Sequence, residues 1–419
     1  MPISDIMKSD IREPKCDIMV GDSIELSKLV EPRSVHTMVT SPPYLWKRKY
    51  DIPDTSWPEV RYRPRPDLDM EIIVEPWVGQ LGQERSPVDY IGHLVAIFRE
   101  VKNVLRDDGT AWLNIGDSYV GKKVADEGSA TNYFSVRPHG YEAGNLLMLP
   151  QSTAQALQAD GWFVRSDITW AKSISYCEGY VGSCAPESPT SWRWIRCGTV
   201  EKGDGQRKFI PCGGCDKCKD TGGFVLLQHA WRPTQSKEAV FMLTKSRHYY
   251  CDKYAVMEEG VYPRGTKGGR GSERRSEAFG VNARPTQYAV YSGKRNLRNV
   301  WTVPILKGNK IKHYAAFPPK LVEPCIKAST SDYGCCAQCG MPWSRVITRD
   351  EEGFEVANGW KQTCDCESHE VAPCRVLDIF HGSGKAANAA KTLGRDYIGI
   401  EISQEFVKES RHIIDKLSA

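Results

Sequence analysis

The stretch from Arg375 to Glu401 constrains the fold more than any other part of the sequence. An apolar run up to Phe380 predicts a buried strand, and His381-Gly382-Ser383-Gly384 predicts a tight turn directly after it. An Ala-rich helix over 385–393 and a second strand over 397–401 follow. A strand, a Gly-x-Gly turn, a helix and a strand that ends in an acid together predict an α/β sheet that binds a nucleoside.

The residue types in this stretch indicate which kind of nucleoside ligand the site would bind. Gly382 and Gly384 allow the backbone to approach a ligand closely, and the carboxylate of Glu401 can accept both hydroxyls of a ribose. The separation of the turn from the acid is close to the ~20 positions typical of such sites. Position 387 is Ala, so the third glycine of a dinucleotide site is missing. The pattern therefore favours a nucleoside without phosphates.

A second feature lies far from the first, at Thr40-Ser41-Pro42-Pro43-Tyr44. The run from Val35 to Val39 predicts a short buried strand that stops at the two prolines. Because proline has no N–H to donate, the chain must leave the sheet there in a stiff, extended turn. Such a turn holds a hydroxyl, a proline carbonyl and an aromatic ring at the carboxyl end of a strand, where open α/β sheets bind ligands. The alternative is a surface turn in which Tyr44 packs on proline.

Other segments have the composition and periodicity of regular elements. The segment from residue 45 to residue 84 has no clear period, which is typical of a lid or a substrate-binding segment. Asp22 follows the first predicted strand, so it is equally a candidate ligand contact and a helix N-cap. Asp107-Asp108-Gly109 predicts a turn. Strands are predicted over 16–20, 110–115, 162–170, 239–244 and 299–303, and helices over 23–29, 87–105, 150–159 and 404–417.

Composition restricts the class of protein and its partners. The 419 residues suffice for a full core, no stretch reaches the length of a membrane span, and the first 15 residues lack the apolar core of a secretory signal. We therefore expect no membrane partner. The net charge is only +4, but nine Lys and Arg residues lie between Arg264 and Arg298. This block is either a phosphate-binding surface or a solvated loop.

The cysteines point to metal. There are 15, and closely spaced thiols in a chain without a secretory signal indicate zinc more than disulfides. The two candidate four-thiolate sites are Cys197, Cys212, Cys215 and Cys218, and Cys336, Cys339, Cys364 and Cys366. A four-thiolate site has no open position, so we expect structural zinc that stiffens these insertions. Several alternatives stay open: Cys177, Cys184 or His229 in place of Cys197, Cys335 or Cys374 in the second site, or free and redox-active thiols throughout.

The two turns together resemble those of the DNA amino-methyltransferases that use S-adenosylmethionine. In that family a Phe-x-Gly-x-Gly turn binds the cofactor and an Asp/Asn/Ser-Pro-Pro-Tyr turn performs the chemistry. The order found here, with the catalytic turn first, resembles the permuted β group of the family and its cytosine-N4-specific type. Four further blocks fall where relatives have similar ones: Gly21-Asp22, residues 108–114 (DGTAWLN), residues 167–172 (DITWAK) and residues 313–318 (HYAAFP).

This resemblance implies a Rossmann-like, S-adenosylmethionine-dependent methyltransferase fold with cysteine-rich, zinc-binding insertions. It implies direct in-line transfer of a methyl group to the exocyclic N4 amine of a flipped cytosine in double-stranded DNA, in a restriction–modification setting and in the cytoplasm of a bacterial or phage-infected cell. The implied catalytic residues are Ser41, Pro42, Pro43 and Tyr44. The implied cofactor-binding residues are Asp22, Asp378, Phe380, Gly382, Gly384 and Glu401.

The resemblance also suggests how the chain divides. The predicted parts are a catalytic half over 1–175, a cysteine-rich zinc insertion over 176–230, a return to the core over 231–255, a basic target-recognition segment over 256–299, core over 300–330, a zinc-ribbon-like insertion over 331–372 and a cofactor-binding half over 373–419. Alternative functions are methylation of adenine N6, methylation of RNA, and a catalytically silent DNA-binding relative. Ser at the first position of the catalytic turn is more typical of cytosine N4 than of adenine N6.

Overall fold

The computed structural model describes residues 11–121, 123–124, 136–137, 139–172, 193–203, 206–227, 233, 235–265, 292–305 and 317–416. The chain forms two compact units, of which the larger comprises residues 1–172 with 237–419 and the smaller comprises residues 173–236. Among the described residues, no helix has both the length and the apolar character that crossing a membrane requires.

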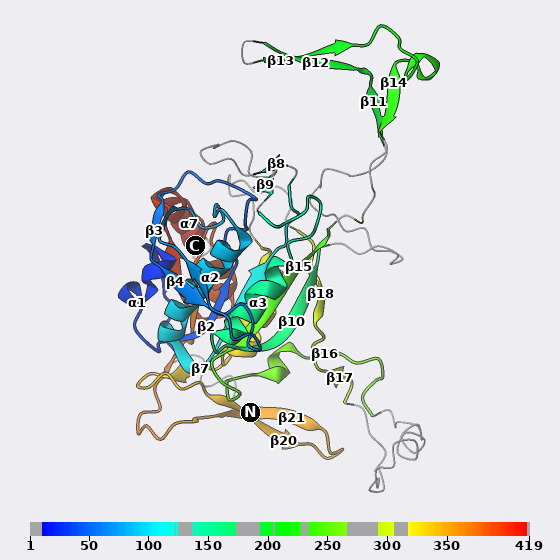
Figure 1. Cartoon of the computed structure of the whole chain (residues 1–419). Helices are drawn as coiled ribbons and strands as arrows, with labels where there is room; N and C mark the ends of the chain where they lie inside the picture. The colour runs from blue at the N-terminus through cyan, green and yellow to red at the C-terminus, as the bar shows by residue number, and fades with distance from the viewer. Residues whose placement is uncertain are drawn as a thin grey trace. The chain divides into compact units, whose positions relative to one another are not determined.

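The centre of the larger unit is an eight-stranded sheet (Figure 1). Its strands, in spatial order, are β1 (Cys16–Val20), β24 (Asp396–Glu401), β23 (Arg375–Asp378), β2 (Val35–Thr40), β7 (Leu105–Ile115), β15 (Lys237–Thr244), β10 (Phe163–Ala171) and β18 (Val300–Thr302). The first five are mutually parallel, and β15 runs antiparallel to both of its neighbours. The α/β fold predicted from the two turns is confirmed, and the strand expected before each turn is present.

Helices cover both faces of this sheet. One face carries α1 (Leu26–Leu29), α2 (Pro87–Val104) and α3 (Leu149–Ala159), and the other carries α5 (Pro319–Ser329), α6 (Lys385–Thr392) and α7 (Gln404–Lys416). Successive side chains of one strand point to opposite faces of the sheet. Met38 accordingly packs with the first set of helices and Val39 with the second. A strand that is buried on both faces needs apolar side chains at consecutive positions, which explains the continuous apolar run before Ser41.

Local sequence explains the longest helix but not the strand after it. The Ser86 side chain accepts a hydrogen bond from the Asp89 N–H, and Pro87 occupies the first turn of α2, as predicted. A turn was predicted at residues 107–109, but β7 already begins at Leu105. Val35 of β2 pairs with Leu105 and Thr37 pairs with Thr110, so two steps on one strand span five on the other. The predicted turn is therefore a bulge inside the strand, because pairing with β2 resumes on both sides of it.

The remaining elements are short. Segment 45–84 contains two small antiparallel sheets that pack on α2, although the sequence shows no strand period there; strands of three residues are too short to display one. Their strands are β3 (Thr55–Trp57), β6 (Trp77–Gly79), β4 (Val60–Tyr62) and β5 (Ile72–Val74). Further pieces of the larger unit are η2 (Ser23–Glu25), β8 (Lys123–Val124), β9 (Val136–Arg137), η5 (Lys253–Val256), β16 (Glu258–Glu259) and β17 (Lys294–Arg295). The smaller unit contains β11 (Arg193–Arg196), β12 (Gly198–Gly203), β13 (Gln206–Pro211), η4 (Lys219–Thr221) and β14 (Phe224–Leu227).

The second cysteine-rich insertion docks on the sheet at the end where β2 and β7 begin. It consists of β19 (Cys335–Cys336), β20 (Ser344–Arg349), β21 (Glu355–Lys361) and β22 (Val371–Ala372). His36 of β2 donates from Nε2 to the Gly340 carbonyl at 2.8 Å, and Arg106 of β7 donates to the Cys339 carbonyl at 3.0 Å. Ser41 and Asp378 lie at the opposite ends of their strands. This insertion is therefore held away from the end of the sheet that carries the two predicted turns.

Candidate active site

The two predicted turns meet in space because their strands are neighbours. Strand β2 leads to Ser41 and strand β23 leads to Phe380, and the two strands pair in parallel. The Thr40 hydroxyl donates to Asp378 Oδ1 at 2.7 Å, and the Phe380 N–H donates to the same oxygen at 3.1 Å. One buried carboxyl group thus joins turns that are 338 positions apart in the sequence. Burial raises the pKa of Asp378 to about 7, although its hydrogen bond from Thr40 acts in the opposite direction.

The Gly382–Gly384 turn is held from the neighbouring strand. Glu401, at the end of β24, accepts from the Gly382 N–H at 2.8 Å and from the Ser403 N–H at 3.0 Å. Gly382 and Gly384 have φ of 50° and 73°, a region that glycine adopts without strain. Burial raises the pKa of Glu401. The carboxylate expected to bind ribose therefore also supports the backbone of the turn, and carboxylate oxygens have lone pairs left for hydroxyls.

One polar atom in this turn fits a bound ligand. The Ser383 side-chain oxygen is buried and has no hydrogen-bond partner among the described residues. Buried hydroxyls in proteins are normally satisfied, so an unsatisfied one inside a glycine turn is a position where a ligand can supply the partner. The turn is also closely packed, since a Cβ at Gly399 would lie 2.6 Å from His381 Nδ1.

Asp22 performs the role of a helix cap. Its carboxylate accepts from the Ile24 N–H at 3.2 Å at the start of η2, and it also accepts from the Thr55 hydroxyl. Thr55 belongs to the segment predicted to be a lid. Asp22 lies at the end of β1, next to the strand that ends at Glu401, so its contact with a cofactor stays a prediction.

The Ser-Pro-Pro-Tyr turn is bonded on several sides. Ser41 Oγ donates to Tyr44 Oη at 3.2 Å, and Tyr44 Oη donates to Glu238 Oε2 at 2.7 Å. The Tyr90 hydroxyl of α2 donates to the Pro43 carbonyl at 3.0 Å. A Cβ on Gly82 would lie 3.1 Å from the carbonyl oxygens of Pro43 and Tyr44. Helix α2 and the segment before it thus set the position of the turn.

A buried acid–imidazole pair supports Gly82. Glu84 accepts from the Gly82 N–H at 2.8 Å, and its other oxygen lies 3.0 Å from His93 Nδ1. The His93 ring stacks on Trp57 with centroids 4.2 Å apart. Burial raises the pKa of Glu84, against the lowering effect of His93. None of these residues stood out in the sequence, because Trp57, Gly82 and Glu84 lie in the segment without a period and His93 lies within a predicted helix.

The sequence did not single out Glu238, and it placed Asn114 and Lys172 in blocks shared with relatives without assigning either a role. Lys172 pairs with Glu238, and Asn114 Nδ2 donates to Glu238 Oε2 at 3.1 Å. The strand was predicted over 239–244, whereas β15 begins two residues earlier, at Lys237. An acid that opens an otherwise apolar buried strand is the signal that could have revealed the role of Glu238.

Comparison with known proteins decides the family. A family model described as DNA methylase, of the N6/N4 type, matches residues 35–337 and 375–412, which is most of the chain. The chain belongs to this DNA methylase family. The prediction made from the two turns and the blocks around them is confirmed. Enzymatic methylation of DNA, rather than silent binding, is the activity of the family to which the chain belongs.

The methylase is similar along most of its length to Type II methyltransferases. It is 28% identical to M.Cfr9I from Citrobacter freundii over 396 residues, which are 92% of this chain and 83% of that protein. It is 25% identical to M.SmaI from Serratia marcescens over 415 residues, which are 97% and 93% of the two chains.

Solved structures are more distantly similar. The cytosine-N4-specific PvuII DNA methyltransferase has a TM-score of 0.45 and 14% identity, over 96% of this chain and 88% of that chain. The complex of M1.HpyAVI with SAM has a TM-score of 0.36 and 12% identity, over 95% and 99%. Because these scores are low, the family assignment depends on the sequence match.

Both predicted cysteine clusters of the methylase assemble. The four side chains of each, Cys197, Cys212, Cys215 and Cys218, and Cys336, Cys339, Cys364 and Cys366, place their sulfurs within 4.8 Å of one another. Cys177, Cys184 and His229, the alternatives to Cys197, lie outside the described residues. The smaller unit therefore contains one complete set of four thiols, and the docked insertion contains the other.

Cys335 and Cys374 lie with His36 instead of joining the second cluster. Both nitrogens of His36 are already engaged, since Nδ1 accepts from the Arg375 N–H at 3.0 Å and Nε2 donates to the Gly340 carbonyl. An imidazole without a free nitrogen has none to offer a metal. This third group is therefore a hydrogen-bonded joint between the insertion and the sheet.

The basic block of the methylase lies mostly outside the described residues, which include only its two ends. At these ends, Arg264 pairs with Asp350 and Glu352. Arg295 and Arg298 both pair with Glu258, at 2.9 and 2.6 Å. Three of the cations counted toward a phosphate-binding surface thus already have acidic partners.

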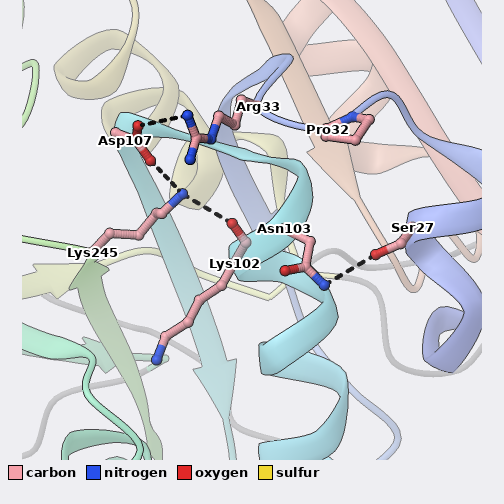
Figure 2. A pocket seen from close by; sticks show the side chains of 7 residues that line it. All are labelled: Ser27, Pro32, Arg33, Lys102, Asn103, Asp107 and Lys245. Carbon is pink, nitrogen blue, oxygen red and sulfur yellow. Dashed lines mark hydrogen bonds and ion pairs between the residues drawn. The ribbon is translucent and has the colours of Figure 1, made fainter.

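A cavity of about 600 Å³ lies at the other end of the sheet from Ser41 (Figure 2). Figure 2 shows Lys245 directed toward Asp107, with an Nζ–Oδ1 distance of 2.8 Å, and Arg33 on the other side of the same carboxylate at 3.7 Å. Lys245 also donates to the carbonyls of Lys102 and Leu105. Its cations are already paired, so this cavity is not where the methylase performs its chemistry.

Proposed function

We propose that this methylase transfers a methyl group from S-adenosylmethionine to the N4 amine of a flipped cytosine in double-stranded DNA, in the cytoplasm. The observation that supports this most directly is the hydrogen bond from Thr40 to Asp378, which holds the Ser-Pro-Pro-Tyr turn beside the Gly-x-Gly turn. A reaction between two bound molecules needs both sites within reach of each other, and the pairing of β2 with β23 provides that proximity.

The proposed chemistry is positioning and electrostatics. An exocyclic amine on a base is a poor nucleophile because its lone pair is delocalised into the ring. Acceptors on its two hydrogens, the Ser41 hydroxyl and the Pro42 carbonyl, favour a pyramidal nitrogen with a localised lone pair. The target must leave the duplex to reach this turn, and the ring of Tyr44 offers a face on which it can stack.

Cofactor binding is proposed for the turn after β23. Phe380 would line the pocket, Gly382 and Gly384 would lie under the methionine part, and Glu401 would hold the ribose. The unsatisfied Ser383 hydroxyl supports a polar ligand at this turn. When bound, the cofactor supplies an electrophilic methyl group on a sulfonium.

The choice of base rests on Ser41. Ser at this position is more typical of cytosine N4 methylation, and Asp of adenine N6 methylation. Methylation of adenine N6 is the second candidate, because the family model includes both types.

We also propose a structural zinc ion in each four-cysteine cluster. Four sulfurs that converge within 4.8 Å, in a chain whose thiols form no disulfides among the described residues, support tetrahedral coordination. The seven-part division predicted from the sequence stays a proposal. The compact unit over residues 173–236 supports its first insertion, and the docked insertion is assigned a structural role away from the target base.

The test is nucleoside mass spectrometry of DNA incubated with S-adenosylmethionine and the protein. Unmodified phage and plasmid DNAs supply varied sequences, and the Ser41→Ala variant is the control. N4-methylcytosine that forms only with the intact protein is the expected result. N6-methyladenine would overturn the choice of base, and methylated RNA beside unmethylated DNA would overturn the substrate.

A further inference from the structure

A chain of hydrogen bonds leads away from the proposed target position. It begins at Ser41 Oγ, passes through Tyr44 Oη and ends at Glu238 Oε2, with distances of 3.2 Å and 2.7 Å. Ser41 and Tyr44 come from the turn after β2, and Glu238 lies at the start of β15, which reaches the same end of the sheet. The Glu238 side chain is only 12% exposed, so water screens this chain weakly.

The carboxylate determines the direction of the chain. A phenol has one proton, and two acceptors face the Tyr44 hydroxyl, Glu238 Oε2 at 2.7 Å and Asn114 Oδ1 at 3.2 Å. The carboxylate oxygen is nearer and charged, and hydrogen bonds to charged groups are the stronger ones, so the proton of Tyr44 points to Glu238. The oxygen of Tyr44 is then left as an acceptor, and the proton of Ser41 points to it. The lone pairs of Ser41 therefore remain for the target amine. Without the carboxylate charge, the Tyr44 proton would have only the neutral acceptors Asn114 Oδ1 and Ser41 Oγ, both at 3.2 Å, and the polarity would no longer be fixed.

The surroundings keep Glu238 oriented. Lys172, at the end of β10, pairs with Oε1, and Asn114 of β7 donates to Oε2 at 3.1 Å. The same Asn114 amide also donates to the Ala239 carbonyl at 3.1 Å. Lys172, Asn114 and Tyr44 are the charged and polar groups that face Glu238 from β10, β7 and the turn after β2. Burial, and then the Glu238 charge, raise the pKa of Tyr44 well above its ordinary value, so the phenol stays a donor.

We propose that Glu238 is a positioning residue for methyl transfer and the final acceptor of the proton that the target amine releases. This inference depends on the proposed function. The step forms the bond between the amine nitrogen and the methyl carbon and breaks the bond between that carbon and sulfur, whose electron pair stays on sulfur. The excess proton on nitrogen passes to Ser41 as the Ser41 proton passes to Tyr44 and the Tyr44 proton passes to Glu238. Water then recovers the proton from Glu238.

The kinetic test compares Glu238→Gln, Tyr44→Phe and the double variant, with Glu75→Gln as an exposed control. Gln keeps the shape of the side chain and cannot take the proton. We expect kcat to fall about 10²-fold in each single variant, the usual size of a proton-transfer contribution, with KM for DNA and S-adenosylmethionine nearly unchanged. The double variant should fall no further than the singles, because the chain is already cut.

A second measurement needs neither DNA nor cofactor. In protein labelled at tyrosine ¹³Cζ, the resonance absent from Tyr44→Phe identifies Tyr44. We expect it to move in Glu238→Gln and to stay in place in Glu75→Gln. An unmoved resonance would overturn the inference, as would a Glu238→Gln kcat within about threefold of wild type or a multiplicative loss in the double variant. If the wild type methylates no DNA, the proposed function fails, and the resonance still decides whether Glu238 orients Tyr44.

Discussion

At the scale of single residues, Asp378 is the most consequential side chain of the site. Its carboxyl group is 1% exposed, yet it joins the two turns through Thr40 and Phe380. A buried carboxyl without a cationic partner resists ionisation, which is why its pKa is raised to about 7. Near neutral pH, both the charged and the neutral form of Asp378 are therefore populated.

This balance predicts a pH dependence of stability. The folded protein binds the Asp378 proton more tightly than the unfolded chain, whose carboxyl has a pKa near ~3.9. Asp378 therefore contributes up to about 4 kcal/mol to the free energy of unfolding. This contribution is fully present below about pH 4 and is lost as pH rises to about 7. Urea unfolding of wild type and Asp378→Asn between pH 4 and 8 measures it. Parallel curves for the two proteins would contradict this expectation.

Ser383 offers a second residue-scale prediction. Because its hydroxyl has no partner among the described residues, Ser383→Ala removes no hydrogen bond that they show. The free energy of unfolding should change by less than about 0.5 kcal/mol. If the hydroxyl contacts the cofactor, Kd for S-adenosylmethionine should rise about 3- to 10-fold, as for one neutral hydrogen bond. Isothermal calorimetry measures this affinity, and an unchanged Kd would remove Ser383 from the site.

At the scale of elements, the position of the Ser-Pro-Pro-Tyr turn depends on the segment that precedes α2. Gly82 has φ of +88° and approaches the backbone of the turn, while Glu84 and His93 hold its own N–H in place. Segment 45–84, predicted to be a lid or a substrate-binding segment, therefore supports the turn from behind. The cofactor turn is supported independently, by Glu401 of β24.

Gly82→Ala should disturb the Ser-Pro-Pro-Tyr turn and leave the Gly-x-Gly turn unchanged. The added Cβ at 3.1 Å from two carbonyl oxygens, in a left-handed conformation, should displace the Pro43–Tyr44 backbone. We expect kcat to fall at least 10-fold, with stability lowered by about 1 kcal/mol and Kd for S-adenosylmethionine unchanged. Calorimetry and steady-state methylation of phage DNA measure these values. An equal loss of cofactor affinity would show that the turns are not independently supported.

At the scale of the whole molecule, the two cysteine clusters differ in what they stabilise. The second cluster is bonded to the sheet through His36 and Arg106, whereas the first lies in a compact unit of its own. Loss of the proposed zinc from the second cluster should therefore affect the main core, and its loss from the first cluster should not.

Single cysteine variants test this difference. Cys339→Ser should lower the Tm of the main unfolding transition by about 5 °C or more, and Cys215→Ser should leave it nearly unchanged. Each should reduce zinc, measured by plasma mass spectrometry, from two ions per chain to one. Wild-type protein without zinc would contradict the metal assignment for both clusters.

Features that depend on local chemistry follow from the sequence alone. Two prolines end a strand, Ser86 caps a helix, and a strand, glycine turn and helix follow one another at residues 375–393, because each depends on neighbours a few positions away. Packing of distant segments sets which strands are neighbours and hence that Thr40 meets Asp378. It also brings Glu238 and Lys172 to the Ser-Pro-Pro-Tyr turn and places Cys335 and Cys374 with His36. These contacts span up to 338 positions, and no local pattern encodes pairing between strands that far apart.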